Sequence, residues 1–207
     1  LFPGPMLGLG LHPEPEIEYR LAKAYNRWLV ETVLPNSPRI KALICLPFNH
    51  HRGSYEIIEE FGGHKDVAGF CVASVRDTAV HSDDLMKCYS LMEEMGKPLS
   101  FHSGTNWSGS HLRHSSRFIA VHSLSFPWYV MVHVANWVTN GLNERFPNLK
   151  VIWAEGGLAW IPFLMQRLDH EYMMRTSEAA GLKKLPSEYM KDMYYSSQPC
   201  EAMHPEQ

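Results

Sequence analysis

The stretch NGLNERFPNLKVIWAEGGLAWIPFLMQRLDHEY, residues 140–172, contains a strand, a turn and a helix in succession. Its middle part, LKVIWAEGG at residues 149–157, is apolar from Val151 to Ala154, which is typical of a strand buried on both faces of a parallel sheet. Residues 160–175 have apolar side chains at helical spacing instead. We therefore expect a buried strand that ends at Glu155, a turn at Gly156 and Gly157, and an amphipathic helix.

The same alternation continues on both sides of this stretch. We expect further strands at residues 39–48, 67–75, 97–104 and 193–199. We expect helices at residues 16–33, 55–61 (with Ser54 as N-cap), 82–95 and 127–146. The first helix places Ile17, Leu21, Ala24, Tyr25, Trp28 and Leu29 on one face. This order predicts an α/β fold with a parallel sheet, either a barrel or a doubly wound open sheet. No glycine-rich phosphate loop follows a strand, which disfavours a nucleotide-binding open sheet.

The composition is that of a folded domain with no preference for a charged partner. The chain has 207 residues, 45% of them hydrophobic, and a formal net charge of −3. We treat residues 1–207 as a single domain and expect no nucleic acid partner, because there is no basic excess. No apolar stretch long enough to cross a bilayer stands out, so we expect no membrane either. Cys45 and Cys71 lie in apolar runs without C-x-x-C spacing, which predicts free thiols and a cytoplasmic location.

His102 lies where a buried strand is expected to end. It follows the mostly apolar residues 98–101 and precedes two small residues, Ser103 and Gly104. An imidazole held at such a strand end can bind a metal ion or transfer a proton. The alternative is a core histidine that bonds a backbone carbonyl, and the spacing alone leaves both interpretations open.

Glu155 has the equivalent position on the next predicted strand. A carboxylate that ends an apolar strand must be paired, protonated or metal-bound, because burying it alone is costly. In the structural alternative its partner is an arginine, for which Arg167 on the following helix is a candidate. Together, His102 and Glu155 suit a metal that polarises a carbonyl group or activates water, with the carboxylate transferring the proton.

The polar segment 105–117, which follows His102, is too long for an ordinary connection, and such loops are often functional. Within it, Trp107 is a candidate for lining a substrate pocket, and Arg113 for gripping a substrate carboxylate. Trp160 is a candidate aromatic wall for a planar substrate. The alternatives are a solvated surface loop for Trp107 and Arg113, and core packing for Trp160.

Residues 140–172 resemble the amidohydrolase-related family of metal-dependent hydrolases and decarboxylases, which includes the aminocarboxymuconate semialdehyde decarboxylase-like enzymes. The resemblance is carried by Gly141, Arg145-Phe146-Pro147, Leu149-Lys150, Gly156-Gly157, Trp160, Pro162, Arg167 and Asp169. The segment AYNRWL at residues 24–29 and the strand that ends in Leu46-Pro47 are also similar, so the resemblance covers nearly the whole chain.

The resemblance implies a (β/α)8 TIM-like barrel with a divalent metal, most often zinc. In this family the metal is held by a His-x-His pair on the first strand, a histidine ending the fifth strand and an aspartate ending the eighth. By position, His102 matches the fifth-strand ligand. The His-x-His pair is absent, because His50 and His51 are adjacent and His12 stands alone. We therefore expect a central barrel segment that lacks the first and last strands, a single domain incomplete at both ends; a naturally shortened scaffold is the other account.

A second departure from the family is Glu155 itself, because many of its decarboxylases have His-Gly-Gly where this chain has Glu-Gly-Gly. We expect Glu155 as the catalytic residue, His102 as a metal ligand, and Trp107, Arg113 and Trp160 as substrate-binding residues. The expected reaction is nonoxidative decarboxylation or hydrolysis of a small carboxylated aromatic or unsaturated molecule. The alternative is a non-catalytic binding protein, derived from the barrel, that has lost its metal site. The resemblance also makes a homodimer the expected assembly.

Overall fold

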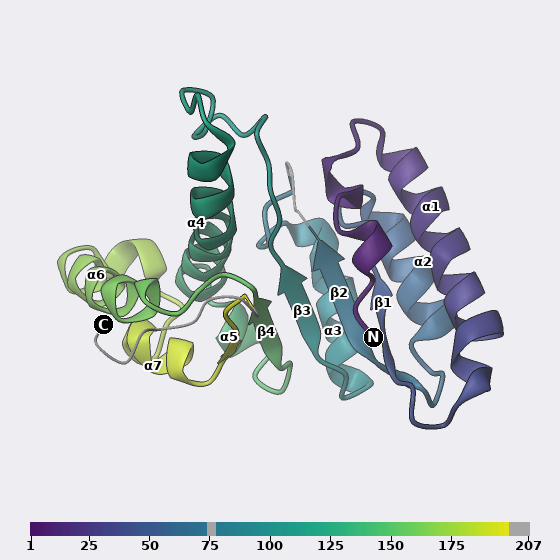
Figure 1. Cartoon of the computed structure of the whole chain (residues 1–207). Helices are drawn as coiled ribbons and strands as arrows, with labels where there is room; N and C mark the ends of the chain where they lie inside the picture. Colours follow the sequence, from purple (N-terminus) through teal and green to yellow (C-terminus); the bar gives the residue numbers. More distant parts are fainter. Residues whose placement is uncertain (74–77, 199–207) are drawn as a thin grey trace.

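The protein is described by a computed structural model over residues 1–73 and 78–198, and its centre is a parallel β-sheet (Figure 1). The strands are β1 (Ala42–Cys45), β2 (Val67–Ala73), β3 (Leu99–His102), β4 (Val151–Ala154) and β5 (Tyr194–Tyr195). They pair in sequence order, each parallel to the next. In this order every crossover moves in the same direction, as in a β/α barrel, whereas a doubly wound sheet reverses its direction. The predicted strands are confirmed but are shorter than expected, and Val75 and Pro199 lie outside the described residues.

Helices and short helical turns connect the strands. The helices are α1 (Pro15–Trp28), α2 (His51–Phe61), α3 (Met86–Glu94), α4 (Phe118–Thr139), α5 (Leu142–Arg145), α6 (Trp160–Met174) and α7 (Pro186–Lys191). The turns are η1 (Gly4–Met6), η2 (Leu9–Leu11), η3 (Leu29–Val33), η4 (Leu34–Asn36), η5 (Asp83–Leu85) and η6 (Thr176–Ala179). Figure 1 shows α2 and α3 behind the sheet and the N-terminal segment, in purple, in front of it.

The two faces of the sheet differ in side-chain size. Residues paired across neighbouring strands point to the same face. One face carries large apolar side chains, in the rows Ile44–Phe70–Leu99–Val151 and Val72–Phe101–Trp153. The Phe101 ring lies 6.0 Å from that of Trp137 on α4, so this face lies under the helices. The other face carries the rows Cys45–Cys71–Ser100–Ile152 and Ala73–His102–Ala154, in which every side chain except Ile152 is small or polar. His102 therefore points to the side that a barrel encloses.

The prediction for the buried face of α1 is wrong for most of its residues, although Leu29 is buried as expected. Ile17 and Trp28 are largely exposed, and the helix instead buries Glu18, Ala22 and Asn26. The reason is a pair of hydrogen bonds at the edge of the sheet: Asn26 Nδ2 donates to the Cys45 carbonyl at 2.8 Å, and the Cys45 amide donates to Asn26 Oδ1 at 2.9 Å. The side-chain amide thus satisfies backbone groups of the edge strand β1, which apolar periodicity does not reveal.

The predicted boundaries of two further helices are also wrong. The N-cap of α2 is His50 and not Ser54, because His50 Nδ1 accepts from the Gly53 amide at 2.9 Å. Helix α4 begins at Phe118 and contains Pro127, the predicted helix start, in its interior. It ends at Thr139, before Gly141 adopts a left-handed conformation (φ 70°). A proline is common at a helix start, so the sequence favoured the wrong boundary.

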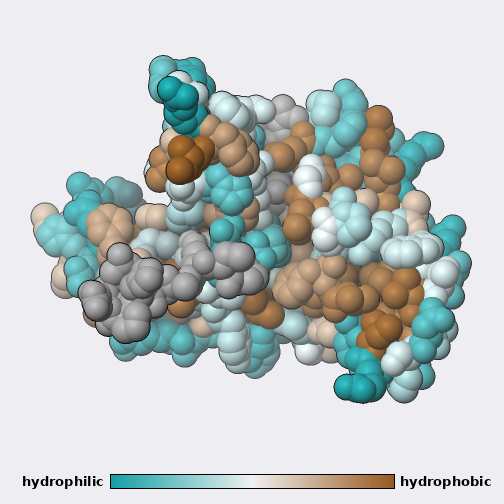
Figure 2. All heavy atoms as spheres, viewed as in Figure 1, coloured by the Kyte–Doolittle hydropathy of each residue, from teal (hydrophilic) through white to brown (hydrophobic). Residues whose placement is uncertain are grey.

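Helix α4 is apolar on most of its surface. None of its 22 residues is charged, and it is the one helix in the described part of the chain that is long and apolar enough to cross a membrane by length and composition. This corrects the expectation that no such stretch exists. Its C-terminal half packs into the core through Val134, Trp137 and Val138. Its N-terminal half exposes Ile119 and further large apolar side chains. Figure 2 shows brown, hydrophobic surface near the protruding end of α4, below a hydrophilic tip.

Candidate active site at the ends of β3 and β4

His102 is buried at the carboxyl end of β3 and both of its ring nitrogens have a neighbour. Nδ1 lies 2.7 Å from the Ser103 carbonyl oxygen, and Nε2 lies 3.3 Å from Glu155 Oε1. A carbonyl oxygen can only accept, so Nδ1 carries the proton and orients the ring. In the neutral ring, Nε2 then presents a lone pair to a carboxylate, and this contact is favourable only with a proton or a cation between the two groups. The structure therefore brings the two predicted residues together in an arrangement suited to proton or metal binding.

The backbone at Glu155 is held in a conformation that non-glycine residues rarely adopt. Its φ is 58°, the only positive value among the non-glycine residues that the structure describes. The Glu155 amide donates to Ser196 Oγ at 3.1 Å, and Ser103 Oγ lies 3.2 Å from the Glu155 carbonyl oxygen, to which it donates. Serines from the two flanking strand ends thus hold this residue in place. Such strain costs about 1–3 kcal/mol and concentrates at functional sites.

The glycine pair after Glu155 allows helix α4 to approach the strand end. A Cβ on Gly156 would lie 2.8 Å from a methyl group of Val130, which packs there from α4. Gly157 has a φ of 73°, the left-handed region that favours glycine. The Glu-Gly-Gly sequence therefore combines a turn with a close contact, and both keep Glu155 beside His102.

A second histidine, His133 on α4, lines a small cavity together with His102, Ser103 and Tyr129. Burial lowers the pKa of His133 to about 4, so its ring is neutral at pH 7. Its Nε2 is buried without a hydrogen-bond partner. His133 was not identified from the sequence as a neighbour of His102. Its spacing of four residues from Tyr129, one helical turn, was the available signal.

The predicted substrate-binding residues lie in different surroundings. Trp107 is 47% exposed and its ring packs 6.0 Å from Phe118. Arg113 is exposed, and its Nε lies 3.4 Å from Nε2 of the neighbouring His114. Trp160 is half-buried, packs edge-on to Tyr195 and donates from Nε1 to the Gly156 carbonyl at 2.7 Å. These contacts link Trp160 to the turn after Glu155, and they place Trp107 and Arg113 on the surface of the loop.

Arg167 is not the partner of Glu155. Its guanidinium lies 3.0 Å from Glu171 on the same helix, on the exposed side of α6. Asp169, by contrast, accepts from the Ser187 amide at 2.8 Å and ties α6 to α7. The helical spacing of Arg167 and Glu171 explains the difference, because residues four apart on a helix meet readily.

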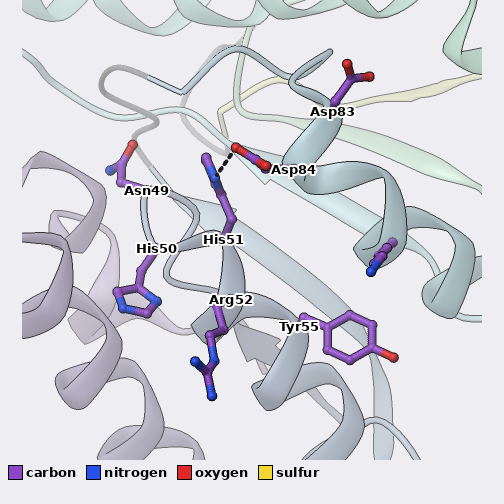
Figure 3. A pocket seen from close by; sticks show the side chains of 8 residues that line it. Asn49, His50, His51, Arg52, Tyr55, Asp83 and Asp84 are labelled. Atoms are coloured by element: carbon purple, nitrogen blue, oxygen red, sulfur yellow. Dashed lines mark ion pairs between the residues drawn. The ribbon is translucent and has the colours of Figure 1, made fainter.

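A cavity of about 740 Å³ lies elsewhere, between α2 and the start of α3. Figure 3 shows His51 turned toward Asp84, at 3.2 Å, while His50 points away from it. The His50 ring stacks on Tyr19 of α1 with centroids 4.9 Å apart. These side chains are already engaged with one another in the helical layer, so size alone does not make this cavity the active site.

The described residues do not form a complete metal site by themselves. Residues 1–73 and 78–198 contain no group of three histidine, cysteine, aspartate or glutamate side chains placed to hold a metal ion. His102 and Glu155 supply two groups at most, and a zinc site in a protein uses at least three. The predicted free thiols are confirmed for Cys45 and Cys71, which are both buried. Cys88 is also free and buried, whereas Cys200 lies outside the described residues.

Comparisons with known proteins agree with this architecture. A model of the Amidohydrolase family (Amidohydro_2) matches residues 11–205. The 2-amino-3-carboxymuconate-6-semialdehyde decarboxylase of Dictyostelium discoideum is 22% identical over 190 residues, which are 91% of this chain and 52% of that protein. The chain thus spans about half the length of this relative.

Solved structures of similar proteins confirm the predicted barrel-type fold. The 5-carboxyvanillate decarboxylase of Sphingomonas paucimobilis superimposes with a TM-score of 0.80 at 22% identity, covering 94% of this chain and 59% of that one. A dihydroxybenzoic acid decarboxylase of a Polaromonas species, with bound manganese and 2-nitroresorcinol, gives a TM-score of 0.72 at 17% identity, covering 90% and 59%. The five-stranded sheet therefore corresponds to part of such a barrel.

Proposed function

Because the chain belongs to the amidohydrolase family, we propose that it carries part of the active site of a metal-dependent decarboxylase. The substrate class we propose is a small carboxylated aromatic or unsaturated molecule. The observation that carries the proposal is the 3.3 Å contact between His102 and Glu155 at neighbouring strand ends. The relatives described above are decarboxylases of such acids, which favours decarboxylation over hydrolysis.

In this proposal Glu155 transfers the proton that the reaction requires. When the bond between the substrate carbon and its carboxyl group breaks, CO₂ leaves, the electron pair remains on the carbon, and a proton replaces the lost group. The Glu155 side chain is 31% exposed and adjoins the buried His102, so it can exchange a proton with solvent and present it to the site. The backbone of Glu155 is strained and is held by hydrogen bonds to Ser103 and Ser196, so it fixes where that proton is delivered.

We propose His102 as a metal ligand, with further ligands supplied by residues other than those described. The fixed Nδ1–H and the free Nε2 lone pair are what a ligating histidine needs. Zinc is the metal expected from the sequence, and the manganese in the Polaromonas structure makes manganese the second candidate. Trp107, Arg113 and Trp160 stay predictions as substrate-binding residues, and Trp160 has the best support because it contacts the turn after Glu155.

The test is a decarboxylation assay on the full-length protein with 5-carboxyvanillate and 2,6-dihydroxybenzoate, together with metal analysis. We expect stoichiometric zinc or manganese, CO₂ release that a chelator abolishes, and loss of both metal and activity in His102→Ala. His114→Ala, an exposed histidine on the neighbouring loop, is the matched control and should retain both. A full-length protein without metal, in which His102→Ala changes nothing measurable, would support the non-catalytic binding protein instead.

We also propose that the protein is a homodimer, with the N-terminal half of α4 in the interface. Ile119 is 76% exposed, Phe118 55% and Trp128 46%, and no charge interrupts this face. Such a face can pair with its own copy without burying an unpaired charge. Light scattering on the full-length protein should give a dimer and, for Ile119→Asp, a monomer. A wild-type protein that is monomeric and binds lipid vesicles would contradict the proposed homodimer. It would also contradict the predictions that the protein has no membrane partner and is cytoplasmic.

A further inference from the structure

A third group contacts the His102 ring, besides the Ser103 carbonyl and the Glu155 carboxylate. The aromatic ring of Phe2 lies edge-on to the imidazole, with centroids 5.8 Å apart and an interplanar angle of 64°. Phe2 belongs to the N-terminal segment, residues 1–11, which lies in front of the sheet in Figure 1. His102 points to this same face, so the N-terminal segment covers part of the side that a barrel encloses.

The N-terminal segment is anchored to the sheet on both sides of Phe2. Before Phe2, the Leu1 carbonyl oxygen accepts a hydrogen bond from the Leu43 amide of β1 at 3.0 Å. After it, the Gly10 carbonyl oxygen accepts from Asn49 Nδ2, on the loop that follows β1, also at 3.0 Å. Both anchors belong to the edge strand or to its loop, so the segment is held in a fixed position in front of the sheet.

The residue that follows Phe2 restricts its backbone. Pro3 is buried, and a proline disfavours the helical region for the residue before it. The Pro3 carbonyl oxygen accepts from the Met6 amide at 2.8 Å, which closes the turn η1 directly after this point. Little backbone entropy therefore remains to be lost when the Phe2 ring packs on His102.

Phe2 and His102 differ in how much water they meet. The Phe2 side chain is 51% exposed, whereas His102 is 6% exposed. A half-exposed aromatic ring gains only part of its possible burial, but here it covers an imidazole that would otherwise meet solvent. A phenyl ring carries no lone pair, so it does not compete with His102 for a metal ion. Apolar groups around a metal site control the access of solvent to its ligands.

We propose that Phe2 is a positioning residue that shields the His102 ring from water and thereby slows the loss of the metal ion. A metal leaves its site as water replaces the ligands, so a cover over one ligand retards release. The inference deepens the proposed function and rests on it only for the metal, because the shielding of His102 involves residues of this chain alone. Phe2 itself binds no metal and transfers no proton.

The first test measures the accessibility of His102 in full-length protein that has been treated with a chelator. Diethylpyrocarbonate modifies accessible neutral imidazoles, and mass spectrometry of the digested protein follows each histidine separately. Phe2→Ala should make the modification of His102 several times faster than in the wild type. Phe2→Leu keeps a large apolar side chain and should stay near the wild-type rate. Phe163→Ala is the matched control, since Phe163 lies on α6 and is 56% exposed, and it should change nothing.

The second test measures the release of metal from the loaded full-length protein into an excess of a coloured chelator. Loss of a group that supports a metal ligand typically weakens metal binding about 10- to 100-fold, so Phe2→Ala should release the metal about tenfold faster. Phe2→Leu and Phe163→Ala should release it at the wild-type rate. The Tm should change little in all three variants, because both phenylalanine side chains are about half-exposed.

The two tests separate the failure of this proposal from the failure of the proposed function. If Phe2→Ala leaves the modification rate of His102 unchanged, Phe2 is not a shield and the proposal is overturned. It is also overturned if Phe2→Ala exposes His102 but the metal leaves no faster than from the wild type. A full-length protein that binds no metal, yet exposes His102 in Phe2→Ala, would contradict the proposed function and leave the shielding of His102 established.

Discussion

The carboxyl end of β3 supplies His102 to a small cavity, and the middle of α4 supplies His133 to the same cavity. The two imidazole rings differ in the hydrogen-bond partners of their nitrogens. His102 has a neighbour at both ring nitrogens, the Ser103 carbonyl and the Glu155 carboxylate. His133 has no partner at Nε2. The strand end therefore fixes the orientation and proton position of its imidazole, whereas the helix leaves one nitrogen free. This contrast separates an imidazole that is oriented by two neighbouring groups from an imidazole that has one nitrogen buried without a partner.

The largest expected effect is at the strand end. Glu155→Gln keeps the size of the side chain but removes its ability to take up and release a proton. If Glu155 transfers the proton, kcat should fall about 10²- to 10⁴-fold, while bound metal and Tm change little. Steady-state kinetics on the full-length protein measures this effect. The control is Glu171→Gln, which changes an exposed carboxylate on α6 and should retain full activity. If the kcat of Glu155→Gln were within tenfold of the wild-type kcat, Glu155 would have no part in the proton transfer.

The second effect belongs to the helix. In the folded protein the pKa of His133 is about 4, against 6.5 for an ordinary histidine. Below pH 6.5 the unfolded chain binds a proton that the folded chain does not, so this residue costs nothing above pH 6.5 and destabilises the fold progressively down to pH 4. The full shift corresponds to about 3 kcal/mol. Urea unfolding of wild type and His133→Leu at several pH values should show a flatter pH dependence in the variant by about this amount.

His114 provides the control for that measurement, because it is exposed on the loop. His114→Gln should retain the acid sensitivity of the wild type. If the free energy of unfolding had the same pH dependence in the wild type and in His133→Leu, His133 would be more hydrated than its position on α4 indicates. His133 would then no longer differ from His102 as a ring with a buried, unpaired nitrogen.

The sequence predicted the strand end far better than the helix, and the reason is physical. An ionisable side chain in a buried strand is expected at the strand end, so His102 and Glu155 stand out in an apolar run. Helix α4 has no charged residue that marks a solvent face, so its periodicity does not reveal which residues turn inward. The orientation of His133 follows from how α4 packs on the sheet, and that packing is a tertiary property. The buried face of α1 was predicted wrongly for a related reason, because Asn26 is buried by hydrogen bonds to β1 and not by apolarity.

A third, smaller effect tests the strained backbone that holds Glu155 beside His102. Glu155→Gly and Glu155→Ala both lose the carboxylate, so the difference between them reports on the backbone alone. At a φ of 58° alanine keeps the strain and glycine relieves it. The glycine variant should be more stable than the alanine variant by about 1 kcal/mol. Thermal unfolding checks this order, and an alanine variant as stable as the glycine variant would show that the turn relaxes once the carboxylate is gone.

The smallest expected effect concerns Arg167, the partner that the sequence suggested for Glu155. Because its guanidinium pairs with Glu171 on the exposed side of α6, Arg167→Ala should destabilise the protein by less than about 0.5 kcal/mol and leave kcat/KM unchanged. His102→Gln serves as the comparison, since it removes the group that does lie next to Glu155 and should reduce activity strongly. If Arg167→Ala instead lowered activity as much as Glu155→Gln, Arg167 on α6 would have to position the Glu155 carboxylate. The contrast between catalytic strand ends and non-catalytic helices would then be wrong.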